Sequence, residues 1–159
     1  MRFRVGQGFD AHALVPGRRL VLAGIELGGT LGLLGHSDAD VLAHAAIDAL
    51  LGASALGDIG GMFPDSDERY RGADSMQLLA LTAQRVRTQG WQLANIDCTI
   101  IAQWPKIAPF VEAMRGALAE ALALEPSAVS IKAKTTEWLG FTGRGEGIAA
   151  LVVVALMAK

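Results

Sequence analysis

The sequence predicts an α+β domain in which helices cover one face of a β-sheet. The chain has 159 residues, the length of a single domain, and 52% of them are hydrophobic, enough for a sizeable core. Segments with the two-residue alternation of strands are mixed with segments of helical pattern and moderate length. No repeat, low-complexity stretch or linker separates them. We therefore expect one domain over residues 1–159, with helices layered on a sheet.

The N-terminal segments are expected to be extended. Residues 2–10 have the alternation of a strand, and Pro16-Gly17 marks a turn. A second extended stretch over 19–27 is closed by Gly28 and Gly29.

A first helix is expected over about residues 40–56. Ser37 or Asp38 can cap its N-terminus, and Gly57 ends it. The polar stretch over 58–72 follows as a loop.

The C-terminal half alternates strands and helices. Asp74 or Ser75 can cap a second helix that runs to about Gln89, where Gly90 stops it. Four main strands with helices on one face predict a four-stranded sheet of ferredoxin-like type. The remaining expected elements are a strand over 91–103, a helix from Pro105 to about Ala123, strands over 127–135 and 147–157, and a glycine-rich loop over 136–146.

The apolar and charged residues argue against a membrane-spanning or nucleic-acid-binding protein. The mean hydropathy is +0.36, yet the longest apolar run, 148–158, is too short to cross a membrane as a helix. A buried strand and burial between copies of the chain explain it better. The net charge of −2 provides no basic field for nucleic acid. The N-terminal residues lack the apolar core of a signal peptide and the lone Cys98 suits a reducing compartment, so we predict a cytoplasmic protein.

Histidines and aspartates cluster in the first third of the chain. Asp10 and His12 are two apart in an extended segment, so both point to one side. Asp40, His44 and Asp48 recur every fourth residue of the expected helix and form one stripe.

Asp10, His12 and His44 together make a ligand set that suits zinc. Two imidazoles and a carboxylate leave a fourth position open, as in catalytic zinc sites, although nitrogen and oxygen ligands also suit other transition ions. The alternative is a turn aspartate, a surface histidine and a core histidine with satisfied hydrogen bonds.

A second informative stretch, 132–147, is suited to phosphate. Its glycines let backbone amides approach an anion, and Thr135, Thr136 and Arg144 offer donors. Glu137 is the kind of oxygen ligand that holds Mg²⁺ against a diphosphate. A glycine-rich hairpin with a structural Arg144–Glu146 pair explains the same stretch. No P-loop, dinucleotide or serine-hydrolase motif is present.

Six segments, in order, resemble one known family. They are Gly8-Phe-Asp-Ala-His12, Gly35-His-Ser-Asp-Ala-Asp40 with His44, Ala55-Leu-Gly-Asp-Ile-Gly60, Phe63-Pro-Asp-Ser-Asp67, Ala102-Gln-Trp-Pro-Lys106 and Lys134-Thr-Thr-Glu-Trp-Leu-Gly-Phe-Thr-Gly-Arg-Gly-Glu146. Together they resemble the 2-C-methyl-D-erythritol 2,4-cyclodiphosphate synthase family of the non-mevalonate isoprenoid pathway, over essentially the whole chain.

The resemblance implies an activity and an assembly. Such enzymes convert 4-diphosphocytidyl-2-C-methyl-D-erythritol 2-phosphate to the cyclic diphosphate and release CMP. A homotrimer with active sites between subunits is implied, with zinc on Asp10, His12 and His44. Mg²⁺ or Mn²⁺ is implied on Glu137 and the substrate phosphates.

The resemblance also implies roles for single residues. His36 and Thr135 match positions that stabilise the transition state, and Asp48 matches the carboxylate that holds the erythritol hydroxyls. Segment 102–108 matches the cytosine pocket, whereas Lys106 read alone is a base or phosphate contact or an ordinary helix-start lysine. Phe141 and Arg144 match the region near the three-fold axis, where some members bind an isoprenoid diphosphate. The implied substrate contacts are Asp10, Ala11, His12, His36, Ser37, Asp48, Asp58, Ile59, Gly60, Phe63, Pro64, Asp65, Ser66, Asp67, Ala102, Gln103, Trp104, Pro105, Lys106, Ile107, Ala108, Lys134, Thr135, Thr136, Glu137, Phe141 and Arg144.

Three departures and two alternative functions stand beside this interpretation. Gln7, Lys134 and Trp138 differ from residues common in the family, and none is an expected zinc ligand. One alternative is a zinc phosphohydrolase that uses water as the nucleophile. The other is a trimeric binding protein for isoprenoid diphosphates.

Overall fold

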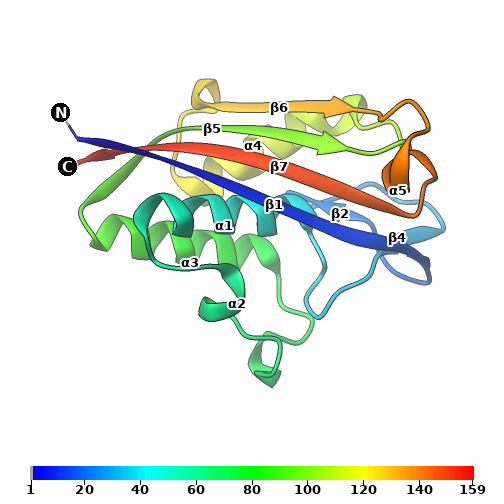
Figure 1. The fold of residues 1–159 in the computed structure, drawn as a ribbon, viewed down its shortest axis with the longest axis horizontal. Helices are drawn as coiled ribbons and strands as arrows, with labels where there is room; N and C mark the ends of the chain where they lie inside the picture. Colours follow the sequence, from blue (N-terminus) through cyan, green and yellow to red (C-terminus); the bar gives the residue numbers. More distant parts are fainter. Residues whose placement is uncertain (1) are drawn as a thin grey trace.

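A computed structural model describes residues 2–159 as a five-stranded sheet with helices on one face (Figure 1). The strand order is β4-β1-β7-β5-β6; β5 and β6 are parallel, and the other neighbours are antiparallel. A separate pair, β2 and β3, forms a hairpin. The strands are β1 (Phe3–Pro16), β2 (Val21–Leu22), β3 (Ile25–Glu26), β4 (Leu31–Leu33), β5 (Trp91–Ile101), β6 (Val129–Lys134) and β7 (Gly147–Ala158).

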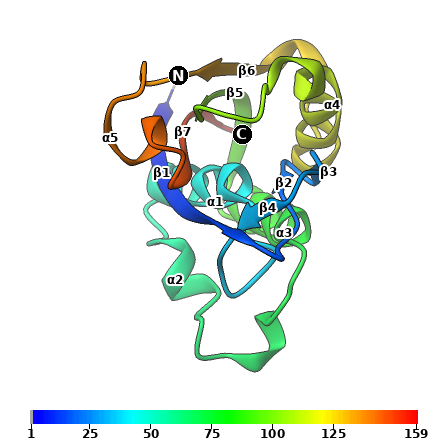
Figure 2. The same cartoon turned by 90° about the vertical axis from the view of Figure 1, so that its right-hand side faces the viewer.

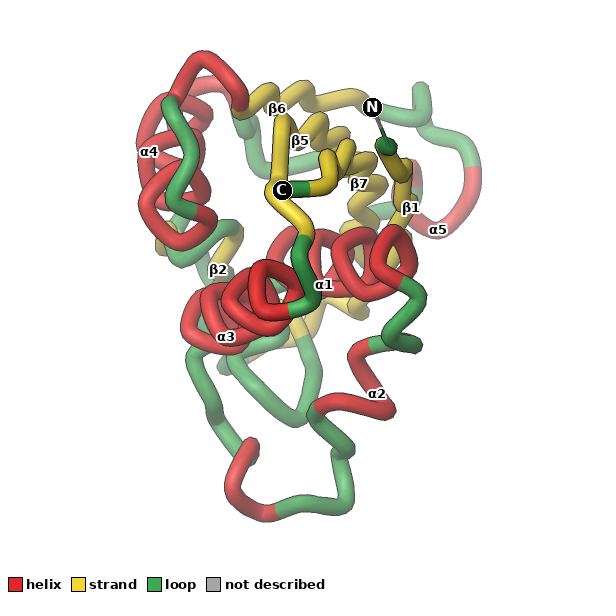
Figure 3. The backbone as a smooth tube through the Cα atoms, turned by 90° about the vertical axis from the view of Figure 1, so that its left-hand side faces the viewer, coloured by secondary structure: helices red, strands yellow, loops and turns green. Residues whose placement is uncertain are grey.

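Three long helices lie together on one side of the sheet, as the view along the strands shows (Figure 2). Helix α1 packs on β1 and β7, α3 packs beside α1, and α4 packs on β6. The opposite view shows the same layering of strands over helices (Figure 3). The helices are α1 (Val41–Ser54), α2 (Ile59–Met62), α3 (Ser75–Thr88), α4 (Val111–Leu122) and α5 (Gly140–Gly143), with 3-10 turns at Glu68–Tyr70, Ala108–Phe110 and Pro126–Ala128.

The expected α+β class is confirmed, but the sheet differs in detail. It has five strands instead of four, because the three-residue β4 pairs with the end of β1. The long strands follow the order strand, helices, strand, helix, strand, strand, and β5–β6 is parallel. A ferredoxin-like domain places its second helix after the third strand, so that exact topology is not found.

Several predicted boundaries moved. The stretch 19–27 is a hairpin, since Ala23 and Gly24 both have positive φ (47° and 72°) and turn the chain back. Helix α1 is capped by Asp40, and neither Ser37 nor Asp38 caps it. Helix α3 is capped by Asp74 and ends before Gly90, as predicted.

Helix α4 begins at Val111, later than the predicted start at Pro105. The intervening residues carry the chain from the buried Ala102 at the end of β5 to the buried Ile107 under the helix layer. No helix among residues 2–159 combines the length and the hydropathy needed to cross a membrane. The cytoplasmic location stays a prediction.

Strand β1 and helix α1 lie unusually close together, and this contact positions the site. A Cβ atom added at Gly6 would lie 2.0 Å from the Ala49 carbonyl oxygen, and one at Gly8 would lie 1.8 Å from that of Ala45. Only glycine on the strand and small residues on the helix permit this approach. The inward side of β1 is therefore held directly against the helix backbone.

The opposite face of the sheet is apolar and open over β1 and β7. Phe3, Val5 and Phe9 alternate along β1 and are 71%, 61% and 55% exposed. On the paired strand, Val153 and Met157 are 39% and 37% exposed. Toward β5 and β6 this face becomes polar, and Asp97 forms an ion pair with Lys132 there. The open apolar part is a candidate interface.

Candidate metal centre and active site

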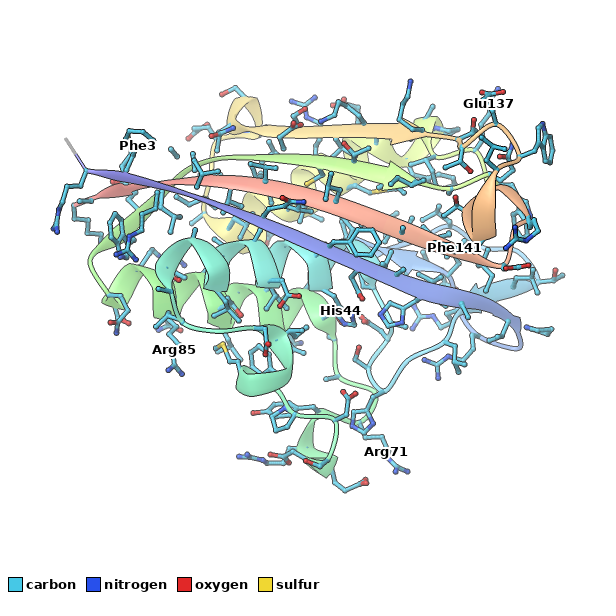
Figure 4. The ribbon with its side chains drawn as sticks, in the orientation of Figure 1. Phe3, His44, Arg71, Arg85, Glu137 and Phe141 are labelled. Carbon is cyan, nitrogen blue, oxygen red and sulfur yellow. The ribbon has the colours of Figure 1, made fainter. Side chains whose placement is uncertain are left out.

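Asp10, His12 and His44 converge where β1 crosses α1. The two β1 residues share the inward side of the strand, as predicted, and His44 lies on the facing side of the helix (Figure 4). Asp10 Oδ2 lies 2.8 Å from His12 Nε2 and 3.1 Å from His44 Nδ1. The two ring nitrogens are 3.0 Å apart. Among the described residues, these three alone form a cluster able to hold a metal ion.

A hydrogen bond from Nδ1 of His12 determines that Nε2 faces the cluster. His12 Nδ1 lies 2.7 Å from the backbone carbonyl oxygen of Leu34. Because a carbonyl oxygen only accepts, Nδ1 donates its proton there, and Nε2 is left to face the cluster and bind a metal. His44 turns Nε2 away from the cluster, toward the hydroxyls of Ser37 (3.0 Å) and Ser75 (2.9 Å).

The cluster is suited to a cation. A carboxylate oxygen and ring nitrogens that present lone pairs repel one another at these distances unless a positive charge lies between them. Tetrahedral zinc with bonds of about 2.0–2.1 Å separates its ligand atoms by roughly 3.3 Å, close to the observed spacing. The donor set therefore fits zinc and leaves a fourth position for substrate.

Protons take the place of the metal when none is bound. Burial disfavours the ionised Asp10, but hydrogen bonds from His12 and His44 outweigh burial and lower the pKa of Asp10 to about 2. Burial likewise opposes the charged His12, yet its hydrogen bond with Asp10 and the charge of Asp10 raise the pKa of His12 above its usual value. The two shifts describe one coupled pair that shares a proton.

A cavity of about 260 Å³ opens beside the cluster. His36 lines it, and the buried His36 Nε2 has no hydrogen-bond partner among the described residues. This nitrogen, on a residue that lines the cavity, therefore lacks the hydrogen-bond partner that buried polar atoms normally have. The cavity is lined by Asp10, His12, Leu34, Gly35, His36, Ser37, His44, Ile59, Gly60, Phe63, Asp65, Tyr70 and Leu78.

Arg18 fastens the loop that carries His36. Its guanidinium donates to the carbonyl oxygens of Leu33 (3.1 Å), Gly35 (3.1 Å) and Ser37 (3.0 Å). A side chain with five donors is suited to three backbone acceptors at once. Arg18 thereby sets the position of His36 relative to the cluster.

Comparison with known proteins decides the family. The model of the YgbB family matches residues 3–157. The chain belongs to the YgbB family. The 2-C-methyl-D-erythritol 2,4-cyclodiphosphate synthase of Moorella thermoacetica is 58% identical over 156 residues, which cover 98% of this chain and 96% of that protein. The resemblance noted from the sequence is thus confirmed.

Solved structures of relatives share the fold. The bifunctional IspDF from Campylobacter jejuni gives a TM-score of 0.96 at 46% identity, over 99% of this chain and 43% of that longer one. A structure described as the CDP complex of IspF from Plasmodium falciparum gives a TM-score of 0.87 at 29% identity, over 99% and 97% of the two chains. The metal cluster and cavity of this YgbB family chain therefore lie in the fold of a nucleotide-binding relative.

The predicted site residues in the second half of this YgbB family chain lie apart from the cavity. Segment 102–108, segment 134–137, Phe141 and Arg144 do not line it. Figure 4 shows His44 beneath β1, on the helix side, and Glu137 beyond the end of β6. Arg144 pairs instead with Glu146, with 2.8 Å between Nε and Oε1, as the structural alternative foresaw. One chain therefore presents two separate groups of expected site residues.

The expected stripe of Asp40, His44 and Asp48 is wrong in part. Asp40 is fully buried and accepts hydrogen bonds from the backbone amides of Ala23, Gly24 and Ala43. It caps α1 and ties the hairpin to the helix, although burial raises its pKa to about 6 against those three bonds.

Asp48 lies on α1 outside the cavity lining. It accepts a hydrogen bond from the backbone amide of Ile59 at 2.7 Å, and burial raises the pKa of its carboxyl. It therefore positions α2, whose first residues do line the cavity.

Sequence reasoning missed several residues around the cluster. Tyr70 lines the cavity and packs edge-on against Phe63, with ring centroids 5.2 Å apart. Ser75 and Arg18 contact the site from other elements. No motif or spacing marks these three, because only the tertiary fold brings them to it.

Proposed function

We propose that this chain converts 4-diphosphocytidyl-2-C-methyl-D-erythritol 2-phosphate to 2-C-methyl-D-erythritol 2,4-cyclodiphosphate and CMP. The convergence of Asp10, His12 and His44 beside an unpartnered His36 carries the proposal. The 58% identity with a synthase of that name supports it. The site offers metal ligands and a hydrogen-bonding imidazole to a phosphorylated substrate.

The reaction is an intramolecular substitution at phosphorus. An oxygen of the 2-phosphate attacks the β-phosphorus and forms the new P–O bond. The bond from the β-phosphorus to the bridging oxygen breaks, and CMP leaves with the electron pair. No enzyme nucleophile is needed, so positioning and charge neutralisation supply the catalysis.

Different residues are assigned to the metals and to the substrate. We assign zinc to Asp10, His12 and His44, and Mg²⁺ or Mn²⁺ to Glu137 together with substrate phosphates. Bound divalent ions supply positive charge that neutralises phosphate oxygens. His36 Nε2 is free to hydrogen-bond a phosphate oxygen in the cavity, and Arg18 holds it there. Thr135 would stabilise the transition state from the second group of residues.

A homotrimer with shared active sites would join the two groups. The metal cavity and the Thr135–Glu137 segment are separate in one chain, so a neighbouring chain has to supply one of them. The exposed apolar face with Phe3, Val5 and Phe9 supports such an assembly. A closed three-fold ring pairs two different surfaces of each chain, as is needed for the metal cavity of one chain to meet the Thr135–Glu137 segment of its neighbour. These two groups are the half-sites of the proposed active site.

We assign the nucleotide and an isoprenoid diphosphate to the group of expected site residues that lies apart from the metal cavity. We place cytosine in segment 102–108 with Lys106, since a relative is described as a CDP complex. Phe141 and Arg144 stay the candidates for an isoprenoid diphosphate. Arg144 would then have to share its guanidinium with Glu146.

Phosphorus NMR tests the function. Purified protein with Zn²⁺, Mg²⁺ and the 2-phosphorylated substrate should yield the cyclic diphosphate and CMP, and Asp10→Ala or His44→Ala should abolish both. Inorganic phosphate or a linear diphosphate would instead indicate a water-dependent phosphohydrolase. Isoprenoid diphosphate binding that persists without zinc, with no turnover, would indicate a binding protein.

A further inference from the structure

A buried chain of hydrogen bonds leads from His44 away from the cavity. His44 Nε2 lies 2.9 Å from Ser75 Oγ, which lies 2.5 Å from Asp38 Oδ1. The backbone amide of Ser75 donates to Asp38 Oδ2 at 3.1 Å. Ser75 is the first residue of α3 and is fully buried. The chain thus joins a metal ligand on α1 to the start of another helix.

The donors and acceptors of these groups give the series of hydrogen bonds one direction. The carboxylate of Asp38 accepts both hydrogen bonds from Ser75, so the single hydroxyl proton of Ser75 points to Oδ1. The oxygen of Ser75 is then left to accept, and the only ring atom it meets is His44 Nε2. With a metal bound, His44 would therefore carry its proton on Nε2 and present the Nδ1 lone pair to the ion that Asp10 and His12 also bind.

Ser37 is consistent with this direction. Its hydroxyl lies 3.2 Å from Ser75 Oγ and 3.0 Å from His44 Nε2, and it accepts from the Ala39 amide at 3.2 Å. The Ser37 hydroxyl can therefore accept from the Ala39 amide and donate its one proton to Ser75. Ser37 has no carboxylate behind it, so it does not set the direction itself.

We propose that Ser75 and Asp38 are positioning residues that fix His44 in the tautomer with Nδ1 free for the metal. The inference rests on the metal site of the proposed function. His12 is fixed by a backbone carbonyl, which every residue provides, whereas His44 depends on two side chains. The two rings consequently use opposite nitrogens, Nε2 and Nδ1, for one ion.

Neither residue is placed to touch substrate. Ser75 does not line the cavity beside the cluster, and Asp38 lines a different cavity between α3 and α4. Stabilising the start of α3 explains the contact from the Ser75 amide to Oδ2, but it leaves the hydroxyl contact to Oδ1 unexplained. Outer residues that orient a ligating histidine typically contribute ~10- to 100-fold to metal affinity.

Zinc affinity of Ser75→Ala provides the first test, measured by competition with a chromogenic chelator. We expect affinity to fall ~10- to 100-fold, because the hydroxyl is lost while the backbone amide still bonds Asp38. Ser54→Ala is the matched control, since the buried Ser54 hydroxyl donates to the Leu50 carbonyl within α1, far from the cluster in the chain. Its zinc affinity should stay within about twofold of the unaltered protein.

The hydrogen bond behind His44 provides the second test, which needs no turnover. Nitrogen-15 and proton spectra of the zinc-loaded protein should show zinc on His44 Nδ1 and a hydrogen-bonded proton on Nε2. Ser75→Ala and the equally sized Asp38→Asn should each weaken that hydrogen bond and shift the Nε2 proton upfield.

The outcomes separate this inference from the proposed function. Unchanged zinc affinity in Ser75→Ala and Asp38→Asn, or an unchanged Nε2 proton shift in both variants, would overturn the inference alone. A protein that binds no zinc at all would overturn the metal assignment and, with it, the inference. If Ser75→Ala failed to fold, Asp38→Asn would decide.

Discussion

At the residue scale, both histidines of the metal cluster are held by hydrogen bonds to the ring nitrogen that faces away from the cluster. His12 is held by the Leu34 carbonyl and His44 by hydroxyls, so each ring turns its other nitrogen toward Asp10 Oδ2. The two-residue spacing correctly predicted that Asp10 and His12 share one side of a strand, because that spacing is a local property. The groups behind them come from other segments, and no local pattern reveals them.

Metal affinity should fall as the pH is lowered. Asp10 raises the pKa of His12 above its usual 6.5, so below that raised pKa a proton occupies the nitrogen that the metal needs. Because one proton is displaced, the zinc dissociation constant should rise about tenfold per pH unit under the raised pKa. Chelator competition from mildly alkaline to mildly acidic pH measures it. His36→Gln should follow the same slope, and a flat profile would contradict the coupling.

Arg18 should matter more than its position in an unremarkable loop suggests. Arg18→Gln loses the fork that spans three carbonyl groups, so unfolding free energy should fall by about 1–3 kcal/mol. The displaced His36 should lower turnover by ~10- to 100-fold. Arg19→Gln is the matched control, because Arg19 forms only an exposed ion pair with Glu26. Equal effects of the two substitutions would refute the role given to Arg18.

At the scale of elements, local signals succeeded and tertiary ones failed. Helix α3 was predicted because Asp74 and Gly90 act within their own turns. The pattern could not show that Asp40 accepts hydrogen bonds from amides 16 and 17 residues earlier, so its expected place in one polar stripe with His44 and Asp48 was a wrong prediction. The short β4 was missed because three residues carry no alternation, and only pairing with β1 makes them a strand.

Close contact of β1 with α1 predicts a sharp glycine requirement. Gly8→Ala puts a Cβ atom 1.8 Å from the Ala45 carbonyl oxygen, so the strand and helix must separate. Unfolding free energy should drop by about 3 kcal/mol, and zinc affinity should drop with it because His44 moves away from Asp10. Chemical denaturation and chelator competition measure the two effects.

Gly52→Ala is the control for that change within the same pair of elements. A Cβ there meets only the Gln7 carbonyl oxygen, at 3.9 Å, an ordinary contact. Alanine in the helix should then stabilise the protein by roughly 0.5–1 kcal/mol. Destabilisation at Gly52 as large as at Gly8 would show that packing density, not the backbone contact, sets the requirement.

At the scale of the whole molecule, the sheet has one face covered by helices and one that is open. The sequence shows the alternation of apolar residues along β1. The mean hydropathy of the chain predicted more apolar surface than one chain buries. Which strands would share that surface depended on the order β1-β7-β5, set by pairings between distant segments. The sequence therefore indicated association without locating it.

Replacing Phe9 by lysine should break the proposed assembly. Phe9 is 55% exposed on the open face, and burial of a lysine amine there would be unfavourable. Light scattering should give about three times the chain mass of 16.6 kDa for the unaltered protein and one chain mass for Phe9→Lys. Leu81→Lys, at a 51% exposed leucine on α3, should leave the trimer intact. A monomeric unaltered protein would refute the shared-site arrangement.

The separation of the metal cavity from the Thr135–Glu137 segment means that two defective chains can repair each other. A chain with Asp10→Ala lacks one half-site, and a chain with Glu137→Ala lacks the other. When the two are unfolded together and reassembled, about a quarter of the subunit contacts in random trimers would pair two intact halves. Turnover would return in the mixture, although each parent alone is inactive, and every revived centre would have drawn its two halves from different parents.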